Sequence, residues 1–223
     1  MLELYDLVYN VCIITIIQSI VFHQPILSKY SNEIKFNYYR SLMCITFTCI
    51  GLNILLTHFW TGIQHPFNYT HPDMNEAYNL FIVYLMVDLI YMAATKNTRT
   101  DLYLHHILII LSLIVCYMTN SFGYLQSVIL ICEIISIVSG IDSMALDDKD
   151  SKLSYLCKKF RKFSIKYIRI PIWIILFIYT IRYTDKLSGI LWYAGIILSG
   201  VMIYLDKYWE NKCDKVISKY ENI

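Results

Sequence analysis

The chain has 223 residues, of which 57% are hydrophobic and only 16% are charged, and its formal net charge is +2. Its mean hydropathy is +0.49, and its apolar content exceeds the roughly 45–50% that is usual for soluble domains. The composition therefore indicates a membrane protein and excludes an ordinary soluble domain. We expect no nucleic-acid partner, and the seven cysteines lack the paired spacing of a zinc site.

Apolar segments long enough to cross a bilayer follow one another along the chain. A transmembrane helix needs about 20 apolar residues, because every backbone polar group must be satisfied within the lipid. Seven segments qualify, at about residues 4–22, 40–57, 77–95, 102–119, 122–140, 167–184 and 187–205. We therefore predict an all-α, multi-pass transmembrane bundle of about seven helices. The first segment is expected to stay as a span, because its start lacks the basic residues of a signal peptide.

Basic residues alternate between the connections that join these segments. The first, third and fifth connections and the C-terminal tail hold 16 of the 19 Lys and Arg residues, and the opposite side holds only Arg182 and Lys186. Because cytosolic connections are rich in Lys and Arg, this pattern predicts a lumenal N-terminus and a cytosolic C-terminus. The glycosylation sequon at Asn68 then falls in a lumenal connection, which is weak support for the same orientation.

Five of the ionisable residues within the predicted spans lie in the cytosol-facing half of the bundle. Asp88 in the third span and Glu133 in the fifth each stand about 10 Å from the cytosolic end, at a rise of 1.5 Å per residue. His105 and His106 open the fourth span, and Arg169 lies near the start of the sixth. Ionisable groups in a bilayer are costly unless they are paired or hydrated, so all five are candidate functional residues.

Helical spacing predicts that the polar residues of three spans face a shared interior cavity. Positions three, four and seven apart lie on one side of a helix. The three polar stripes are Tyr84, Asp88, Tyr91 and Thr95; Gln126, Glu133, Ser136 and Gly140; and His105, Ser112, Cys116 and Thr119. We interpret Asp88, Glu133 and the histidines as candidate catalytic residues. Tyr84, Tyr91, Ser112, Ser136 and Arg169 are candidate substrate-binding residues.

The two adjacent histidines are predicted to point in different directions, because neighbouring residues on a helix diverge by about 100°. His105 lies on the polar stripe, whereas His106 shares a face with Ile110 and Leu113. Asp101, four residues before His105, could orient its imidazole.

Structural alternatives stay open for each of these groups. The histidine pair can contact lipid head groups, and Asp88 and Glu133 can each serve as a structural hydrogen-bond partner. Arg169 can instead anchor its helix at the head groups of the cytosolic leaflet.

Two further patterns belong to the predicted connections. His58, His65 and His71 could in principle hold a metal ion, but prolines beside two of them indicate an ordered loop, so we predict no metal site. In the fifth connection, an apolar face is surrounded by basic residues. This pattern is typical of an interfacial amphipathic helix that attracts anionic lipid or the phosphates of coenzyme A, with a simple positive-inside signal as the alternative. The apolar residues are Leu153, Leu156, Phe160 and Phe163.

Four segments, "FNYYRSLMCITF", "YLMVDLIYM", "RTDLYLHHILII" and "SVILICEIISIVSG", follow in an order that resembles the TLC domain family. The resemblance covers about residues 33–208 and implies a six-helix core around a lipid-accessible cavity. Residues 1–32 would add an N-terminal helix and loop, and residues 209–223 a cytosolic tail. The resemblance also implies an endomembrane location, chiefly the endoplasmic reticulum.

The ceramide synthases of this family use a histidine pair and two aspartates to transfer an acyl group from acyl-CoA to a sphingoid amine. His105 and His106 match the pair, whereas Glu133 and Ser136 stand at the aspartate positions. The chain thus resembles the smaller family members, which are assigned to lipid regulation or trafficking, more closely than the synthases.

The leading interpretation is a multi-pass membrane protein that handles or regulates membrane lipids through a cytosol-facing polar cavity, without a cofactor. One alternative is an acyl-CoA-dependent N-acyltransferase, in which His105 or His106 acts as general base or nucleophile and Glu133 or Asp88 orients it. A proton-coupled transporter is the second alternative. It is disfavoured because no pair of spans is broken by Pro or Gly.

Overall fold

The computed structural model describes residues 4–66, 69–121 and 123–221, and all regular structure in these ranges is helical. The α-helices are α1 (Leu4–Phe22), α2 (Asn32–Thr57), α3 (Phe59–Gln64), α4 (Pro72–Ala94), α5 (Thr100–Met118), α6 (Gly123–Ile131), α7 (Ser139–Asp147), α8 (Ser151–Ser164), α9 (Ile170–Arg182) and α10 (Gly189–Glu221). Three 3-10 turns, η1 (Pro25–Leu27), η2 (Cys132–Ser136) and η4 (Thr184–Lys186), and a π-helical turn, η3 (Ile165–Arg169), join them. Asn68 lies outside the described residues.

Seven helices in the described part of the chain are long and apolar enough to cross a membrane, which confirms the predicted fold class. Five of them are α1, α2, α4, α5 and α10. The fifth span in chain order, Gly123–Asp147, combines α6, η2 and α7, and the sixth, Ser151–Arg182, combines α8, η3 and α9. The protein is therefore a multi-pass helical bundle.

Two helices extend well beyond their predicted limits. Helix α2 begins at Asn32 rather than near residue 40, with Ser31 as its N-cap, so that Arg40 lies two turns inside the helix. Helix α10 continues past residue 205 to Glu221, although residues 209–223 were predicted as a tail. Trp209, Cys213 and Ile217, four residues apart, are buried along its inner side and explain why it stays helical.

The fifth and sixth spans are interrupted, although both were predicted as regular helices. The 3-10 turn η2 separates α6 from α7, and the π-turn η3 separates α8 from α9. The two interruptions meet in the interior, where the Arg169 Nη1 donates to the main-chain oxygen of Cys132 at 2.6 Å. Neither turn itself contains Gly or Pro, but Pro171 at the start of α9 lacks the N–H that would continue the helical hydrogen bonds and is a sequence signal for the break at η3. The residues of η2 carry no such signal.

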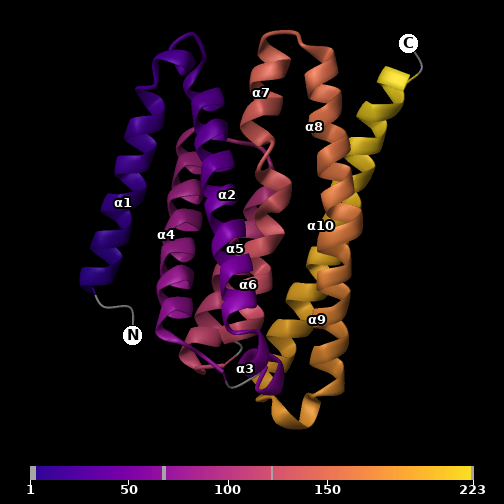
Figure 1. The fold of residues 1–223 in the computed structure, drawn as a ribbon. Helices are drawn as coiled ribbons and strands as arrows, with labels where there is room; N and C mark the ends of the chain where they lie inside the picture. The colour runs from indigo at the N-terminus through magenta and orange to yellow at the C-terminus, as the bar shows by residue number, and fades with distance from the viewer. Residues whose placement is uncertain (1–3, 67–68, 122, 222–223) are drawn as a thin grey trace.

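The predicted interfacial helix of the fifth connection is instead an upright extension of the sixth span. Helix α8 continues the direction of α9 and packs along α7 and α10 (Figure 1). Its apolar residues Leu153, Leu156 and Phe163 face outward and are exposed. Lys158 and Arg161 point inward, where they contact Asp142 and Ser139.

Helix α1 lies at one edge of the bundle against α2 and α4, and α9 and α10 lie at the other (Figure 1). The α1–α2, α4–α5 and α7–α8 connections and the end of α10 share one end of the bundle, which we call the basic end. At this end the Lys29 Nζ and the Tyr30 hydroxyl donate to the Asp148 carboxylate, at 2.8 and 2.5 Å. These two hydrogen bonds keep the pKa of Asp148 below its ordinary value.

Helices α2 and α7 approach each other so closely at Gly140 that a side chain has no room there. A Cβ atom at this position would lie 2.4 Å from the Tyr38 Cα. We expect Gly140→Ala to destabilise the folded protein by about 1–3 kcal/mol, because the backbones must move apart. Equilibrium unfolding in mixed micelles measures this change.

Gly200→Ala is the matched control, since a Cβ at Gly200 has no neighbour within 4 Å. This control should be neutral or slightly stabilising, because alanine favours a helix over glycine by about 1 kcal/mol. Equal stability of the two variants would show that the α2–α7 contact is not tight in the membrane.

Candidate functional site

A cavity of about 540 Å³ opens at the basic end, between α2, α4, α5, η2, α7, α8 and α10. Its buried part holds both histidines and three carboxylates, and its more exposed part holds basic side chains. The ionisable residues that line it are Arg40, Asp88, Arg99, His105, His106, Glu133, Asp142, Lys158, Arg161, Lys212 and Lys215. The predicted shared cavity is thus present among the described residues.

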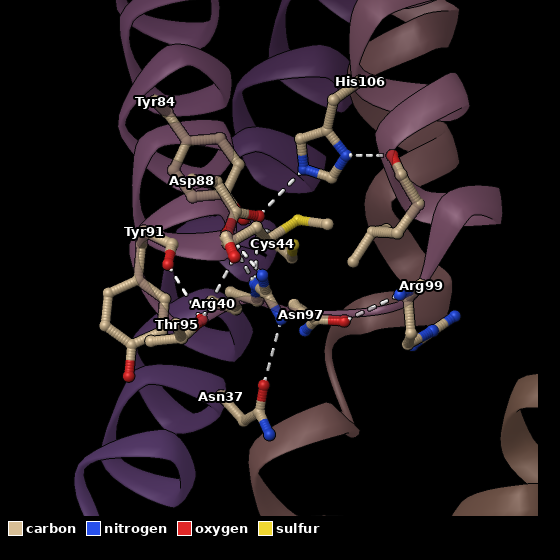
Figure 2. Close-up of polar contacts among 12 residues, drawn as sticks. Asn37, Arg40, Cys44, Tyr84, Asp88, Tyr91, Thr95, Asn97, Arg99 and His106 are labelled. Carbon is tan, nitrogen blue, oxygen red and sulfur yellow. Dashed lines mark hydrogen bonds and ion pairs between the residues drawn. The ribbon is translucent and has the colours of Figure 1, made fainter.

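Asp88 is the centre of a buried charge cluster that joins three helices (Figure 2). Arg40 of α2 donates hydrogen bonds to this carboxylate. Its Nε lies 2.9 Å from both oxygens, and its Nη2 lies 2.5 Å from Oδ1. His106 of α5 contacts the same carboxylate from the other side, with 2.8 Å between Nε2 and Oδ2. Asn37 supports Arg40 by accepting from its Nη1 at 3.1 Å. A carboxylate with this many donors is fixed in place.

His106 has both ring nitrogens engaged. Its Nδ1 lies 2.8 Å from the main-chain oxygen of Leu102, and its Nε2 contacts Asp88. The main-chain oxygen and the carboxylate are both acceptors, so each ring nitrogen of His106 faces an acceptor atom. His106 was predicted to share a face with Ile110 and Leu113 rather than to lie on the polar stripe, and the structure shows that it also lines the cavity. Helix α5 packs between α4 and α10. The His105 and His106 side chains therefore each reach a carboxylate, although they diverge by about 100°.

His105 faces the second carboxylate. Its Nε2 lies 3.6 Å from the Glu133 Oε1, which is close enough for an ion pair but longer than a hydrogen bond. The other Glu133 oxygen, Oε2, accepts from the Cys44 thiol at 3.5 Å. The His105 Nδ1 is buried and has no hydrogen-bond partner among the described residues. The two imidazoles meet edge to face, with ring centroids 5.2 Å apart.

Asp101 does not orient His105 directly, contrary to the prediction. Its carboxylate accepts from the Trp209 indole Nε1 at 2.7 Å and from Arg99 at 2.9 Å. The Trp209 ring in turn packs edge-on against the His105 ring, with centroids 5.6 Å apart. Asp101 therefore fixes the position of Trp209, whose ring packs against the His105 imidazole.

Arg169 is fully buried and does not reach the head groups, so the anchor interpretation is wrong. Its Nε lies 3.0 Å from the Asp206 Oδ1 of α10, and its guanidinium lies over the Trp209 ring at 5.4 Å. Arg169 is also absent from the described residues that line the cavity. The structure thus gives Arg169 a pairing role behind the site, although it was predicted to bind substrate.

The remaining predicted substrate-binding residues divide into two groups. Tyr84 and Ser136 line the cavity. Tyr91 stacks on Phe36 with ring centroids 3.5 Å apart, and its hydroxyl donates to the main-chain oxygen of Asn32. Ser112 borders a separate, smaller hollow of about 60 Å³ between α5, α6, α9 and α10. Tyr91 and Ser112 are therefore not brought to the histidines.

Sequence reasoning missed four residues that complete the site: Arg40, Asp142, Asp206 and Trp209. Arg40 was assigned to a connection because the start of α2 was placed too late. Asp206 was detectable in principle, because a cation inside a span requires a partner at the same depth, and Arg169 had none assigned. Asp142, which pairs with Lys158 and accepts from Ser154 at 2.8 Å, lay beyond the predicted end of the fifth span.

Comparison with known proteins adds no relative: no protein-family model, curated protein or solved structure matches this chain. Fold and site therefore define the class by themselves. The chain is an integral, multi-pass helical membrane protein with two carboxylate-paired histidines in a polar cavity.

Proposed function

We propose that this protein handles acyl lipids, in the manner of the TLC-type membrane proteins that it resembles, by binding an anionic head group in the cavity at the basic end. The excess of positive charge on the cavity wall carries this proposal. Six Lys and Arg side chains line the cavity, against three Asp and Glu. A cavity at a membrane surface that is lined by more cationic than anionic side chains attracts phosphate groups.

The ligand enters from the side of the basic end, which positive-inside reasoning assigns to the cytosol. Its phosphates contact Arg161 and Lys215, which line the cavity and have no carboxylate partner among the described residues. Arg99 and Lys212, whose side chains are 47% and 50% exposed, add to the positive charge but pair with Asp101. The apolar chain lies among the outward-facing apolar residues of the neighbouring helices. The proposed location is an endomembrane such as the endoplasmic reticulum, with a lumenal N-terminus.

Photo-crosslinking of the purified protein tests this binding. The probes are a long-chain acyl-CoA and a phosphatidic acid, each with a diazirine in the acyl chain. Arg161→Gln/Lys215→Gln removes two cavity cations and should lower labelling about tenfold, and the remaining labelling should fall with added salt. The two probes distinguish a coenzyme A phosphate from a lipid head group.

Lys152→Gln/Lys219→Gln is the matched control, because it removes the same charge from exposed positions of α8 and α10 outside the cavity lining. Labelling of this control should stay within about twofold of wild type, as exposed charges are well screened. An equal loss in both double variants, or no labelling of the wild type, would contradict the proposal.

Acyl transfer to an amine is the second candidate function, and the state of His105 favours it. Its Nε2 faces Glu133, while its Nδ1 is not engaged by any described residue. An imidazole held on one side by a carboxylate is the arrangement of a general base. His105 would take the proton from the attacking amine as the C–N bond forms and the thiolate leaves.

A further inference from the structure

The chain brings a second group of metal-ligating side chains together at the end of the bundle opposite the cavity. Helix α2 ends at Thr57, and His58 is its C-cap. Helix α4 begins with His71 as N-cap and Asp73 in its first turn. The rings of His58 and His71 lie 4.8 Å apart, and one ligand atom from each of His58, His71 and Asp73 lies within 4.8 Å of the other two.

His71 and Asp73 are spaced for chelation. The His71 Nδ1 lies 3.4 Å from the Asp73 Oδ1. Two donor atoms on a tetrahedral zinc ion, each about 2.0 Å from the metal, are about 3.3 Å apart. The main-chain N–H of Asp73 also points at this Nδ1, at 3.4 Å. Because an amide can only donate, the contact places the unshared electron pair of His71 on Nδ1, beside the carboxylate, and a metal ion bound there takes the place of this N–H.

His58 is oriented by a neighbour in the way that zinc-bound histidines usually are. Its Nδ1 lies 2.8 Å from the Tyr69 hydroxyl, and the two rings are 5.6 Å apart. A metal-binding imidazole usually donates its second N–H to such an oxygen, which fixes the ring and its tautomer. When His58 donates through Nδ1 to the Tyr69 oxygen, its Nε2 keeps the unshared electron pair that a metal needs.

We propose that His58, His71 and Asp73 bind one Zn²⁺ ion, with water as the fourth ligand. Two neutral imidazoles and one carboxylate are a ligand set that zinc accepts. The negative charge of Asp73 offsets the positive end of the α4 dipole, which would otherwise oppose a cation there. The bound ion joins the end of α2 to the start of α4 and stabilises the connection between them.

Zinc binding to the full-length protein in detergent tests the site. The protein is stripped with EDTA and titrated with Zn²⁺ in a calorimeter, and Co²⁺ absorption reports the coordination geometry. Thiols are zinc ligands as well, and those of Cys12 and Cys49 are exposed, so every protein in the series carries Cys12→Ser and Cys49→Ser. We expect one ion per chain.

Asp73→Asn and His71→Ala should each weaken zinc binding by more than about 100-fold. Tyr69→Phe, which removes the partner of His58, should weaken it by roughly 10- to 100-fold. His65→Ala is the matched control, because His65 is exposed in the same connection and lies outside the cluster; its affinity should equal that of the parent protein.

Unfolding of each variant without zinc checks that the protein is folded, and added zinc should raise the unfolding midpoint of the parent but not of Asp73→Asn. The proposal is overturned if the folded parent binds no zinc. It is also overturned if Asp73→Asn and His71→Ala bind like the parent, or if His65→Ala loses binding to the same extent.

Discussion

Asp88→Ala is expected to destabilise the folded protein by about 3–5 kcal/mol, because it leaves Arg40 and His106 buried without their shared acceptor. The Asp88 side chain is only 2% exposed, and those of Arg40 and His106 are 13% and 5% exposed. Water in the adjoining cavity can reach Arg40 in part, which favours the lower half of this range. Equilibrium unfolding in mixed micelles gives the difference.

The double variant Arg40→Met/Asp88→Leu shows how much of the lost stability comes from the unpaired charge of Arg40 and how much comes from the lost contacts. Removing both members of a buried pair costs far less than removing one, so the double variant should recover part of the stability that Asp88→Ala loses, while His106 still lacks its acceptor. A stability of Asp88→Ala equal to that of wild type would mean that Asp88 carries no buried ion pair in the membrane.

His105→Ala is expected to lower acyl transfer by about 10²- to 10⁴-fold, which is the usual contribution of a general base. The measurement is N-acyl product formed from a long-chain acyl-CoA and a long-chain amine, with variants matched for abundance. Glu133→Ala should reduce the rate in the same assay, because Glu133 faces the His105 Nε2.

His106→Gln should behave differently, because His106 is a positioning residue with both nitrogens engaged. Glutamine still offers a donor to Asp88, so His106→Gln should keep more of the rate than His106→Ala, and both should keep more of it than His105→Ala. If wild type forms no N-acyl lipid but still takes up the diazirine probes, acyl transfer is ruled out and lipid binding stands.

The depth of the polar residues could be predicted from the sequence, but their partners could not. Asp88, Glu133 and the histidines do line one cavity, as their positions along the predicted spans indicated. The direction of each side chain depended on two features that the hydropathy pattern did not contain, although the N-cap Ser31 is a local signal for the first of them. These are the early start of α2, which brings Arg40 to Asp88, and the break at η2, which carries Glu133 toward His105.

The basic residues show the same contrast between what the sequence predicts and what helix packing decides. Their alternation between connections is a property of composition, and the structure gathers many of them at one end of the bundle. Lys158 and Arg161 were placed on a helix lying at the interface, yet they line the cavity because α8 stands upright against α7 and α10. Helix orientation follows from packing against neighbours, which a single amphipathic pattern does not contain.

The sequence by itself determined that this protein is a bundle of seven spans with ionisable groups at one depth. Hydropathy is a local property, and the bilayer fixes the length of apolar chain that can cross it. Only the tertiary structure decided which charges pair: Arg40 with Asp88, Arg169 with Asp206, and each histidine with its own carboxylate. Pairing depends on which helices touch and where they break, because an ionic contact acts over a few ångströms between residues far apart in the chain.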